Sequence, residues 1–280
     1  MWEPDDIEYD KLAEYQAKKL NYIYGVIIMP HNLLRDRFEL IAYRGGAGER
    51  PENTMAAFRH AASLSSDIIM DLDLQSAKDQ TVVVIHDDTL DRTTSGSGPV
   101  SDYSVSELKK LDAGCHFLDA SGEHSFRDKG ITIPTLEEVL AELDDTRFII
   151  DFRKNDPEQI KQVIAIVENT GAVDRVIMVS ELDEAINTCR NLRPDWIYGA
   201  PTNETRMVIF GSQTPRSPIL MFPESHEGVQ ILSPELIARL HGHGTKVWIY
   251  TIDEPDTLDR LKGQGVDGIF TNLPGVMLAL

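Results

Sequence analysis

Short runs of apolar and β-branched residues alternate with longer segments of helical periodicity along most of the chain. The strand-like runs cover residues 39–43, 68–74, 81–85, 148–152, 175–179, 196–198, 219–222, 246–251 and 268–271. Helices are expected at residues 54–63, 104–111, 135–143, 157–170, 182–192, 234–243 and 254–263. Strands that alternate with helices are typical of a parallel sheet with crossover helices. With roughly eight strands, the pattern predicts an α/β fold closed into a TIM (β/α)8 barrel.

Several of these helices begin at recognisable capping signals. Ser104 is followed three residues later by Glu107, and Thr135 is followed in the same way by Glu138, which is the capping-box pattern. Residue 233 is a serine and residue 234 a proline, a residue favoured in the first turn of a helix. These signals locate the helix starts independently of the hydrophobic pattern.

The length and composition of the chain fit one globular domain. A chain of 280 residues, of which 41% are hydrophobic, can bury a large core, and no linker rich in Pro, Gly or Ser divides it. We expect an N-terminal helical extension over residues 1–38 and the barrel domain over residues 39–280. The extension could cap the barrel, mediate self-association or lie on a lipid surface, and capping or packing is favoured.

The charge and the cysteines exclude some classes of function. The chain has 27 Lys and Arg against 46 Asp and Glu, a formal charge of −19, so we expect no nucleic-acid partner. Cys115 and Cys189 cannot form a disulfide framework and fit a reducing compartment. The acidic N-terminus is unlike a secretory signal, and no apolar run is long enough for a transmembrane segment. We therefore expect a cytoplasmic protein.

Three aspartates interrupt or end apolar strands. Asp71 and Asp73 lie in the run 67–74, and Asp151 lies in the run 148–153. Side chains two residues apart on a strand face the same side of a sheet, so Asp71 and Asp73 share one space. Buried carboxylates are costly unless a cation or another charge compensates them, and Ca²⁺ and Mg²⁺ prefer oxygen ligands. We predict that the three aspartates bind a divalent cation (Ca²⁺ or Mg²⁺); the alternative is a solvated polar strand face.

A histidine follows the next predicted strand. If Asp79 and Gln80 form a two-residue hairpin loop, the antiparallel register places His86 opposite Asp73. Directly opposed residues are neighbours in a sheet. The sequence therefore predicts an imidazole beside the acidic pair, where it could transfer protons to or from a bound ligand.

Further polar residues follow the ends of other predicted strands, namely Tyr43 and Arg44, then Arg153, then Tyr250. Active sites of (β/α)8 barrels gather at the C-terminal ends of the strands. Acidic residues for a cation, arginines for phosphate oxygens and a histidine for proton transfer are what a phosphodiester site requires. Tyr250 could stack on a substrate or simply pack in the barrel.

Several ordered motifs resemble those of the glycerophosphodiester phosphodiesterase family. They are the segments 41–48 (IAYRGGAG), 51–58 (PENTMAAF), 84–94 (VIHDDTLDRTT), 96–100 (GSGPV), 133–139 (IPTLEEV) and 265–271 (GVDGIFT), together with the strand that carries Asp71 and Asp73. The resemblance implies a TIM barrel of the phospholipase C-like phosphodiesterase type. It also implies metal-dependent hydrolysis to glycerol phosphate and an alcohol, with a small glycerophosphodiester or lysophospholipid as the substrate.

The residues that the family uses at its active site have counterparts in this chain. By resemblance they are His86, Tyr43 and Arg44 for catalysis, Asp71, Asp73 and Asp151 for the metal, and Arg44, Glu52, Arg153 and Tyr250 for substrate binding. On spacing alone, Glu52 could equally cap the helix that begins near Thr54.

The chain also differs from the family pattern. The family usually has His at the position of Tyr43, Glu at the positions of Asp71 and Asp151, and Lys at the position of Arg153. It often has Trp at the position of Tyr250. Shorter carboxylates enlarge a cation site, which Ca²⁺ tolerates better than Mg²⁺. A tyrosine, with an ordinary pKa of about 10, can donate a proton but hardly accept one at neutral pH, which leaves His86 as the base. Two hypotheses follow: a phosphodiesterase with reduced activity, or a catalytically impaired relative that binds a phosphodiester or a metal.

Overall fold

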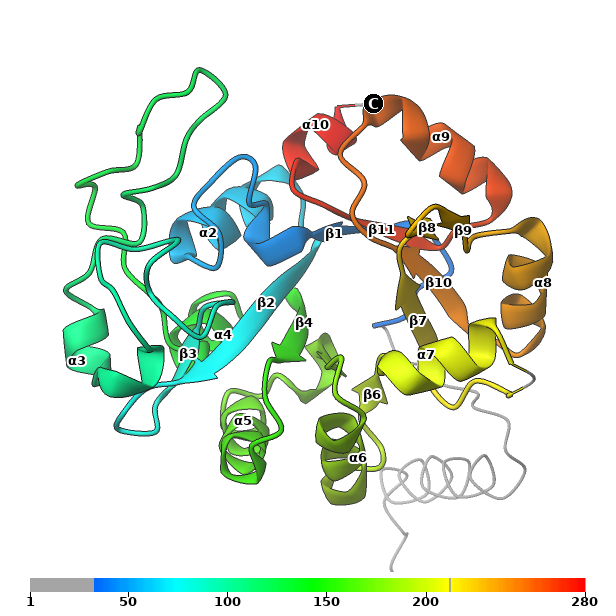
Figure 1. Cartoon of the computed structure of the whole chain (residues 1–280), viewed down its shortest axis with the longest axis horizontal. Helices are drawn as coiled ribbons and strands as arrows, with labels where there is room; N and C mark the ends of the chain where they lie inside the picture. Colours follow the sequence, from blue (N-terminus) through cyan, green and yellow to red (C-terminus); the bar gives the residue numbers. More distant parts are fainter. Residues whose placement is uncertain (1–32, 212, 280) are drawn as a thin grey trace, which may run out of the picture.

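Eight parallel strands form a ring that helices surround (Figure 1). The computed structural model describes residues 33–211 and 213–279. The ring strands are β1 (Glu39–Ala42), β2 (Ile69–Ser76), β4 (Arg147–Phe152), β5 (Val176–Val179), β6 (Ile197–Tyr198), β7 (Ile219–Phe222), β10 (Lys246–Ile249) and β11 (Gly268–Thr271). They pair in the order β6-β5-β4-β2-β1-β11-β10-β7, and a bridge between Gly199 and Ile219 joins the two end strands. The predicted TIM (β/α)8 barrel is confirmed.

The helices lie outside the ring, and most begin where the sequence predicts. They are α2 (Met55–Leu64), α3 (Val105–Leu108), α4 (Leu136–Glu142), α5 (Pro157–Asn169), α6 (Asp183–Leu192), α7 (Thr202–Ile209), α8 (Pro234–Gly242), α9 (Pro255–Gln264) and α10 (Pro274–Leu278), with short 3-10 turns η1 (Tyr43–Gly45), η2 (Val100–Asp102) and η3 (Val173–Arg175). Capping boxes start α3 at Ser104 and α4 at Thr135. The pattern did not predict α7 or α10, which are short.

Alternation along the strands separates an inner from an outer apolar layer. Ile41, Ile69 and Ile149 belong to a buried cluster inside the ring, whereas Met70 and Phe148 pack outward among the helices. The inward residues of β2 change from apolar to acidic along the strand, in the order Ile69, Asp71, Asp73, since every second residue faces inward. The barrel is therefore apolar in its middle and acidic toward the C-terminal ends of its strands.

An ion pair closes the opposite end of the barrel. Arg147, at the start of β4, donates to both carboxylate oxygens of Glu39 on β1 at 2.8 and 2.7 Å, and both side chains are buried. The same guanidinium also donates to the backbone oxygens of Leu33 and Asp67. This network fixes the N-terminal ends of β1 and β4 far from the acidic end.

Strand β3 (Val82–Val84) lies outside the ring and pairs antiparallel with the end of β2, with Leu74 opposite Val84. The predicted register is wrong by one residue, because Ile85 and not His86 hydrogen-bonds to Asp73, its amide lying 3.0 Å from the Asp73 carbonyl oxygen. The turn has three residues rather than two, since the amide of Ala77 donates to the carbonyl of Thr81. A shift of one residue reverses the face of every side chain in a strand.

Besides α10, two segments that were not predicted as structured elements lie beside the C-terminal ends of the ring strands. One is α7, and the other is a hairpin of β8 (Ser225–His226) and β9 (Val229–Gln230), which lies over β7 and β10 in Figure 1. Glu227 and Gly228 both have positive φ, of 48° and 78°, as a two-residue type I′ turn requires. Residues of α7 and of this hairpin line the largest cavity described below.

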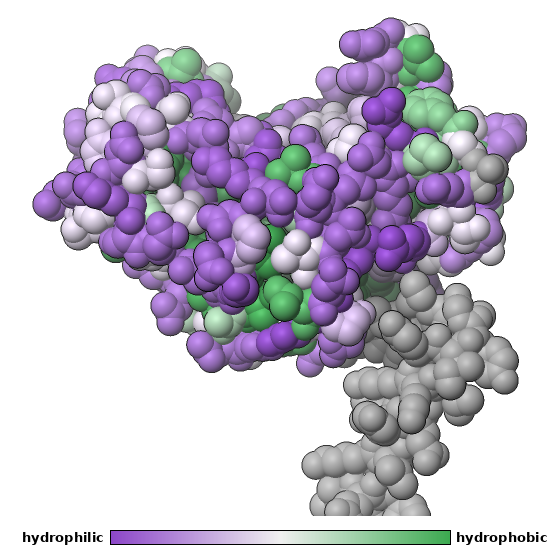
Figure 2. Space-filling view, turned by 60° about the horizontal axis from the view of Figure 1, so that its bottom comes forward, coloured by the Kyte–Doolittle hydropathy of each residue, from purple (hydrophilic) through white to green (hydrophobic). Residues whose placement is uncertain are grey.

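The helical extension predicted for the N-terminus falls mostly on residues 1–32, which lie outside the described residues, so it stays a prediction. Residues 33–38 form turns and bends, and Leu33 is buried inside the barrel. In the described part of the chain, no helix is long and apolar enough to cross a membrane. Figure 2 shows one face of the molecule as mostly hydrophilic, with hydrophobic residues in small separate groups.

Candidate active site

The three predicted aspartates meet at the C-terminal end of the ring. Asp71 and Asp73 lie on β2 and Asp151 on β4, and Asp73 is directly paired with Asp151 in the parallel register. All three side chains line one large cavity, which confirms that the sequence-predicted acidic residues come together. Asp71 and Asp151 each follow an inward-facing isoleucine, Ile69 and Ile149, so the acidic group lies on a hydrophobic floor.

Burial and mutual repulsion make Asp71 and Asp151 weak acids. Burial, together with the charges of Asp73 and Asp151, raises the pKa of Asp71 well above its ordinary value. Burial and the charge of Asp73 raise the pKa of Asp151 to about 8. Carboxylates held in this way bind positive charge strongly when they are ionised.

Side chains of the protein offset part of this negative charge. Arg153 donates to Asp151 at 2.9 Å and lies 3.9 Å from Asp73, so its guanidinium sits between the two strands. Asn53 donates its amide to Asp73 at 2.9 Å, and the backbone amide of Arg44 donates to Asp71 at 3.2 Å. One carboxylate oxygen, Oδ1 of Asp151, is buried without a hydrogen-bond partner among the described residues.

The donor set matches a hard divalent cation in kind. All of the candidate ligands are carboxylate oxygens, which Ca²⁺ and Mg²⁺ prefer, and the unpartnered Oδ1 of Asp151 is a free ligand atom. In residues 33–211 and 213–279, however, no three His, Cys, Asp or Glu side chains are positioned to hold a metal ion. Arg153 occupies the space between Asp73 and Asp151, so a cation bound there has to displace its guanidinium.

Arg44 enters the site on a strained turn directly after β1. Its φ of 51° lies in the left-handed region, which side chains other than glycine rarely adopt and which is frequent at functional sites. Gly45 follows with φ of 81°, and a side chain there would meet Ala57 and Phe58 at 2.9 Å. This turn directs the Arg44 guanidinium at Asp73, whose Oδ2 lies 3.6 Å from Arg44 Nε.

Tyr43 lines the cavity next to Arg44. Its hydroxyl oxygen accepts a hydrogen bond of 2.8 Å from the Arg44 guanidinium. Burial raises the pKa of Tyr43, and the nearby charge of Arg44 only partly opposes this effect. The phenol therefore stays protonated at neutral pH and can donate a proton or a hydrogen bond, as expected from the sequence.

A chain of ion pairs connects Arg44 to His86. Glu52 accepts from Arg44 at 3.0 Å and from Arg92 at 2.7 and 2.8 Å. Arg92 also donates to Asp87, and Asp87 Oδ1 lies 2.6 Å from His86 Nδ1. Glu52 does not cap α2; that position belongs to Thr54, whose hydroxyl accepts from the amide of Ala57.

The charges within this series of ion pairs keep its two acids, Glu52 and Asp87, ionised. Burial alone would raise the pKa of Glu52, but hydrogen bonds from Arg92 and the charge of Arg44 outweigh it, so the pKa is lowered. Hydrogen bonds from Arg92 also hold the pKa of Asp87 far below its ordinary range. An ionised Asp87 keeps the neutral imidazole's proton on Nδ1 of His86, which leaves the lone pair of Nε2 free to accept another proton.

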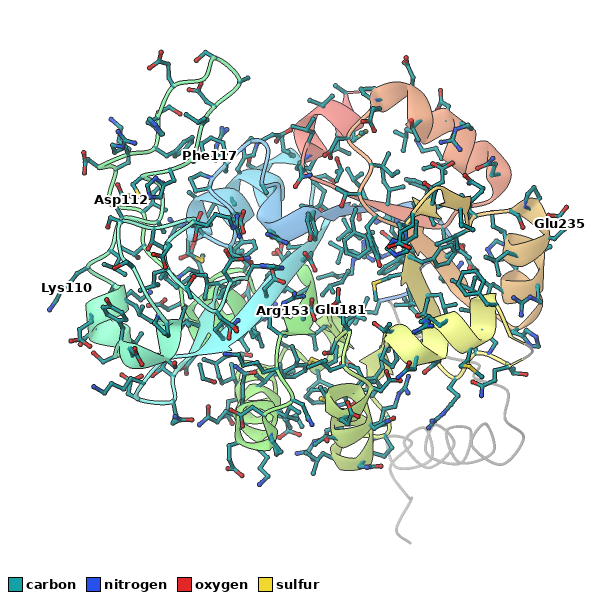
Figure 3. The ribbon with its side chains drawn as sticks, in the orientation of Figure 1. Lys110, Asp112, Phe117, Arg153, Glu181 and Glu235 are labelled. Carbon is teal, nitrogen blue, oxygen red and sulfur yellow. The ribbon has the colours of Figure 1, made fainter. Side chains whose placement is uncertain are left out.

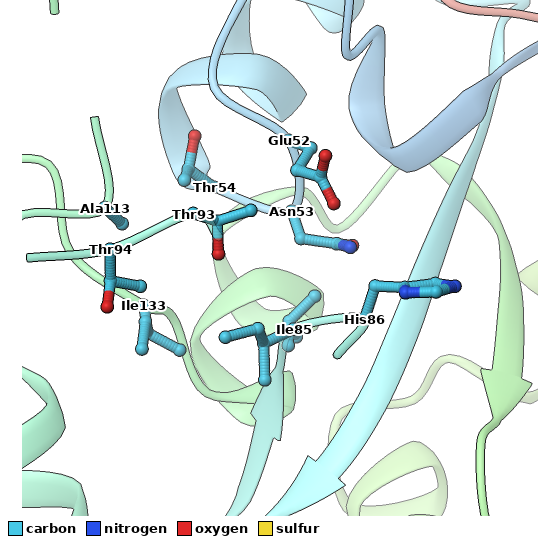
Figure 4. Close-up of a pocket in the computed structure, with 10 residues that line it drawn as sticks. Glu52, Asn53, Thr54, Ile85, His86, Thr93, Thr94, Ala113 and Ile133 are labelled. Carbon is cyan, nitrogen blue, oxygen red and sulfur yellow. The ribbon is translucent and has the colours of Figure 1, made fainter. Parts of the chain in front are cut away.

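His86 itself lies past the end of β3, where strand pairing no longer determines its direction. It lines a small pocket with Glu52 and Asn53, and the three side chains extend in the same direction in Figure 4. Asn53 donates a hydrogen bond to Asp73, and Glu52 accepts one from Arg44. His86 is therefore on the flank of the acidic group, although not through the hairpin register predicted from sequence.

The acidic group forms one end of a cavity of about 790 Å³. Arg153 and Glu181 lie next to each other near the centre of the ring, whereas Lys110 and Glu235 lie at its periphery (Figure 3). Tyr250, on the far side, is partly exposed, lines the same cavity and packs edge-on against Phe270 at 6.1 Å between ring centroids. The structure thus supports both the stacking and the packing interpretation of Tyr250.

Sequence reasoning assigned no role to Asp87 or Arg92, and it treated Asn53 only as a match to the family pattern or as a helix cap. Asp87 and Arg92 lie within the quoted motif 84–94, and Asn53 lies within the motif 51–58. The signal for Asp87 was its place directly after the histidine, because an adjacent carboxylate often orients an imidazole. The signal for Arg92 was weaker, since its two partners lie 5 and 40 residues away in the chain.

Comparison with known proteins gives consistent results. Residues 44–276 match the model of the glycerophosphoryl diester phosphodiesterase family. The chain is 33% identical over 248 residues to a glycerophosphodiester phosphodiesterase of Caldanaerobacter subterraneus, covering 86% of this chain and 96% of the relative. It is 28% identical over 277 residues to the lysophospholipase D of Homo sapiens, covering 87% of each.

Solved structures show the same fold. The glycerophosphodiester phosphodiesterase of Agrobacterium tumefaciens superposes with a TM-score of 0.71 and 26% identity, covering 87% of this chain and all of that one (100%). A phosphodiesterase of Oleispira antarctica, solved in complex with the product sn-glycerol-3-phosphate, superposes with a TM-score of 0.72 and 23% identity, covering 86% and 95% of the two chains.

Proposed function

Because this chain belongs to the glycerophosphodiester phosphodiesterase family, we propose that it hydrolyses glycerophosphodiesters to glycerol phosphate and an alcohol with the help of a divalent cation. The observation that carries the proposal is the group of three carboxylates at the barrel mouth, two of them buried and Asp151 partly buried, flanked by Arg44 and by the His86–Asp87 pair. Negative charge gathered in this way serves no purpose in packing, since its burial alone destabilises the fold.

The proposed cation ligands are Asp71, Asp73 and Asp151. When bound, the cation would neutralise charge on the phosphoryl oxygens and so favour attack at phosphorus. The raised pKa values of Asp71 and Asp151 support this assignment, because a cation would offset both the burial and the repulsion that raise them. Arg153, which pairs with Asp151, would be released toward the substrate if a cation took its place.

Arg44 is the proposed phosphate ligand. Its Nε is buried and, within the described residues, lacks a hydrogen-bond partner, while its other nitrogens are held by Glu52 and Tyr43. A guanidinium held on two sides keeps a fixed orientation, which suits recognition of a phosphate oxygen. Glu52 carries negative charge, so we assign it to positioning Arg44 and Arg92 rather than to contacting the phosphate.

His86 is the proposed general base. Asp87 fixes the proton on Nδ1, so that Nε2 can take a proton from the attacking water. Tyr43, whose hydroxyl is protonated and held by Arg44, would donate a hydrogen bond or a proton to the oxygen of the leaving alcohol. One histidine and one tyrosine thus divide the work of base and acid.

A second candidate function rests on Tyr43 and Arg153. Tyr43 is a poor base, and Arg153 blocks the space between Asp73 and Asp151. Both features also fit a catalytically impaired relative that binds a phosphodiester or a metal without turning it over.

Choline release from glycerophosphocholine separates the two functions. The full chain is treated with a chelator and then supplied with Mg²⁺, Ca²⁺ or Mn²⁺ in turn. We expect turnover only with a cation, and a loss of about 100-fold or more in kcat for His86→Gln, since general base catalysis contributes roughly that amount. The matched control is His243→Gln, at an exposed histidine outside both pockets, which should leave kcat unchanged.

Two results together would support the second candidate function. The wild type would release no choline with any of the three cations, and Tyr43→His, which places an imidazole at that position, would not increase choline release. Turnover by the wild type that persists without any cation would overturn the proposed role of Asp71, Asp73 and Asp151.

A further inference from the structure

Arg92 connects two segments of the active site that are far apart in the sequence. Its Nε donates to Oδ2 of Asp87 at 2.7 Å, and its Nη1 donates to Oε2 of Glu52 at 2.7 Å. The third nitrogen, Nη2, donates to both carboxylates, at 2.8 Å to Glu52 and at 3.0 Å to Asp87. One guanidinium therefore makes two hydrogen bonds to each of two carboxylates, and it joins the connection before α2 to the segment after β3.

Each of the two carboxylates also contacts one residue of the proposed reaction. The Oε1 atom of Glu52 that accepts from Arg92 accepts from Arg44 as well, at 3.0 Å. The Oδ1 atom of Asp87 that accepts from Arg92 lies 2.6 Å from Nδ1 of His86. A single carboxylate thus separates Arg92 from the proposed phosphate ligand on one side and from the proposed base on the other.

The surroundings of Arg92 do not fit a role in substrate contact or in folding. Arg92 lines neither of the two pockets described above. Its side chain is 47% exposed, and exposed ion pairs contribute little to stability because water screens them. Two-point contacts between a guanidinium and a carboxylate do, however, fix the orientation of both groups. Orientation of the two carboxylates is therefore the better explanation of these contacts.

Arg92 also has the largest effect in keeping the two carboxylates charged. Burial raises the pKa of Glu52, and hydrogen bonds from Arg92 are the largest effect that opposes it. Hydrogen bonds from Arg92 are likewise the main cause of the lowered pKa of Asp87. Arg44 and Arg92 together balance the charges of Glu52 and Asp87. Without Arg92, the group would carry a net negative charge beside the proposed phosphate ligand.

We propose that Arg92 is a positioning residue for the hydrolysis, which orients the base His86 through Asp87 and the phosphate ligand Arg44 through Glu52. This role rests on the proposed function, in which His86 and Arg44 have these tasks. Gln75 holds the backbone oxygen of His86, but among the described residues only Asp87 is hydrogen-bonded to its ring. The direction of the ring therefore depends on how firmly Asp87 is held.

Kinetics of Arg92→Gln with glycerophosphocholine, using the full chain and the cation that supports turnover, test both connections. We expect kcat to fall about tenfold and KM to rise about tenfold, since small displacements of reacting groups are costly. The matched control is Arg59→Gln, because Arg59 on α2 makes a two-point ion pair with Glu142 away from both pockets. It should leave kcat and KM unchanged, and each variant is assayed well below its unfolding temperature.

A double variant distinguishes positioning from a general loss of structure. In the His86→Gln background, Arg92→Gln should lower kcat by less than about twofold, because no base remains to be oriented. The rise in KM should persist there, since Arg44 is still present. A tenfold fall in kcat in both backgrounds would overturn the positioning of His86.

Arg92→Lys separates positioning from charge. Lysine keeps the positive charge, but its single ammonium cannot make two-point contacts with both carboxylates. We expect KM to return close to the wild-type value and kcat to stay at least about fivefold lower. A wild-type kcat in Arg92→Lys would show that charge alone suffices and would overturn the proposal. Should Arg92→Gln fail to fold, Arg92→Lys supplies the same measurements.

The ring nitrogens of His86 give a measurement that needs no turnover. Their ¹⁵N chemical shifts in NMR, assigned by their loss in His86→Gln, report which nitrogen of the neutral ring carries the proton. We expect the proton on Nδ1 in the wild type and a larger population with the proton on Nε2 in Arg92→Gln. Unchanged shifts in Arg92→Gln would overturn the connection to His86, whatever the wild-type activity. Changed shifts in a chain that hydrolyses no glycerophosphocholine would contradict the proposed function and support the positioning of His86.

Discussion

Individual residues of the site stand in environments that cost stability. Asp71, Asp73 and Asp151 are gathered on an apolar floor, and Arg44 adopts a left-handed backbone conformation. Strain and buried like charges persist only where the surrounding structure holds them in place. The cost at these positions is consistent with selection for binding rather than for packing, and it can be measured one residue at a time.

Replacing Asp151 by Asn should stabilise the cation-free protein at pH 8. The pKa of Asp151 is about 8 in the folded protein against 3.8 in the unfolded chain, so the folded state holds this proton more tightly. Its contribution to stability is therefore fully present below about pH 4 and is lost as the pH rises toward 8. Asp151→Asn removes this dependence, and we expect a gain on the order of 1 kcal/mol at pH 8 with loss of turnover.

Thermal unfolding in the presence of a chelator, at pH 5 and pH 8, measures this difference. Asp259→Asn, at an exposed aspartate on α9, is the control and should change neither value by more than about 0.5 kcal/mol. A variant that is less stable than the wild type at pH 8 would mean that the ion pair with Arg153 outweighs the burial of the charge.

At the scale of single elements, local signals account for the helices better than for the connecting segments. Thr54, Thr135 and Ser233 each accept a hydrogen bond from the first turn of the helix that follows. The hairpin between β2 and β3 instead depends on whether its loop has two or three residues, and Gln80, with φ of 65°, takes the third position. Elements with a side-chain cap are therefore set locally, whereas the turn was decided by the paired strands.

The cap of α5 provides a quantitative check on this distinction. Asp156 accepts hydrogen bonds from the amides of Glu158 and Gln159, at 3.0 and 3.3 Å. Asp156→Ala should lower the free energy of unfolding by about 1 kcal/mol, measured by urea denaturation, because the two amides lose their partner. Asn169→Ala, at the exposed other end of the same helix, should change it by less than about 0.5 kcal/mol. Equal effects of the two variants would contradict the capping role.

Across the whole molecule, the two ends of the barrel have different tasks. The end that carries Arg147 and Glu39 is sealed by a buried ion pair, and the opposite end carries an open cavity lined by carboxylates. Parallel strands direct all of their C-terminal ends to one side, so binding residues gather there and the other end is left to stabilise the fold.

Breaking the sealed end should therefore reduce stability without affecting turnover. Arg147→Met leaves Glu39 buried without its main partner, and we expect a loss of about 3 kcal/mol in the free energy of unfolding. The double variant Glu39→Gln with Arg147→Met should recover at least half of that loss, because no unpaired charge remains. Glycerophosphocholine hydrolysis well below the unfolding temperature should stay at the wild-type rate. A double variant no more stable than the single one would show that the backbone contacts of Arg147 carry the effect.

The sequence by itself determined the barrel, the helix starts and the inward position of Asp71, Asp73 and Asp151, because periodicity and capping depend on residues close together in the chain. The ordered motifs added the family and the residue types of the site. Only the tertiary structure decided the register of His86, the place of Arg153 between two carboxylates, and the link from Arg44 through Glu52 and Arg92 to Asp87. It also brought Phe210 and Val229, which lie on different elements, to the lining of one cavity. These contacts join residues that no local pattern relates, so their geometry exists only once the strands are paired and the barrel is closed.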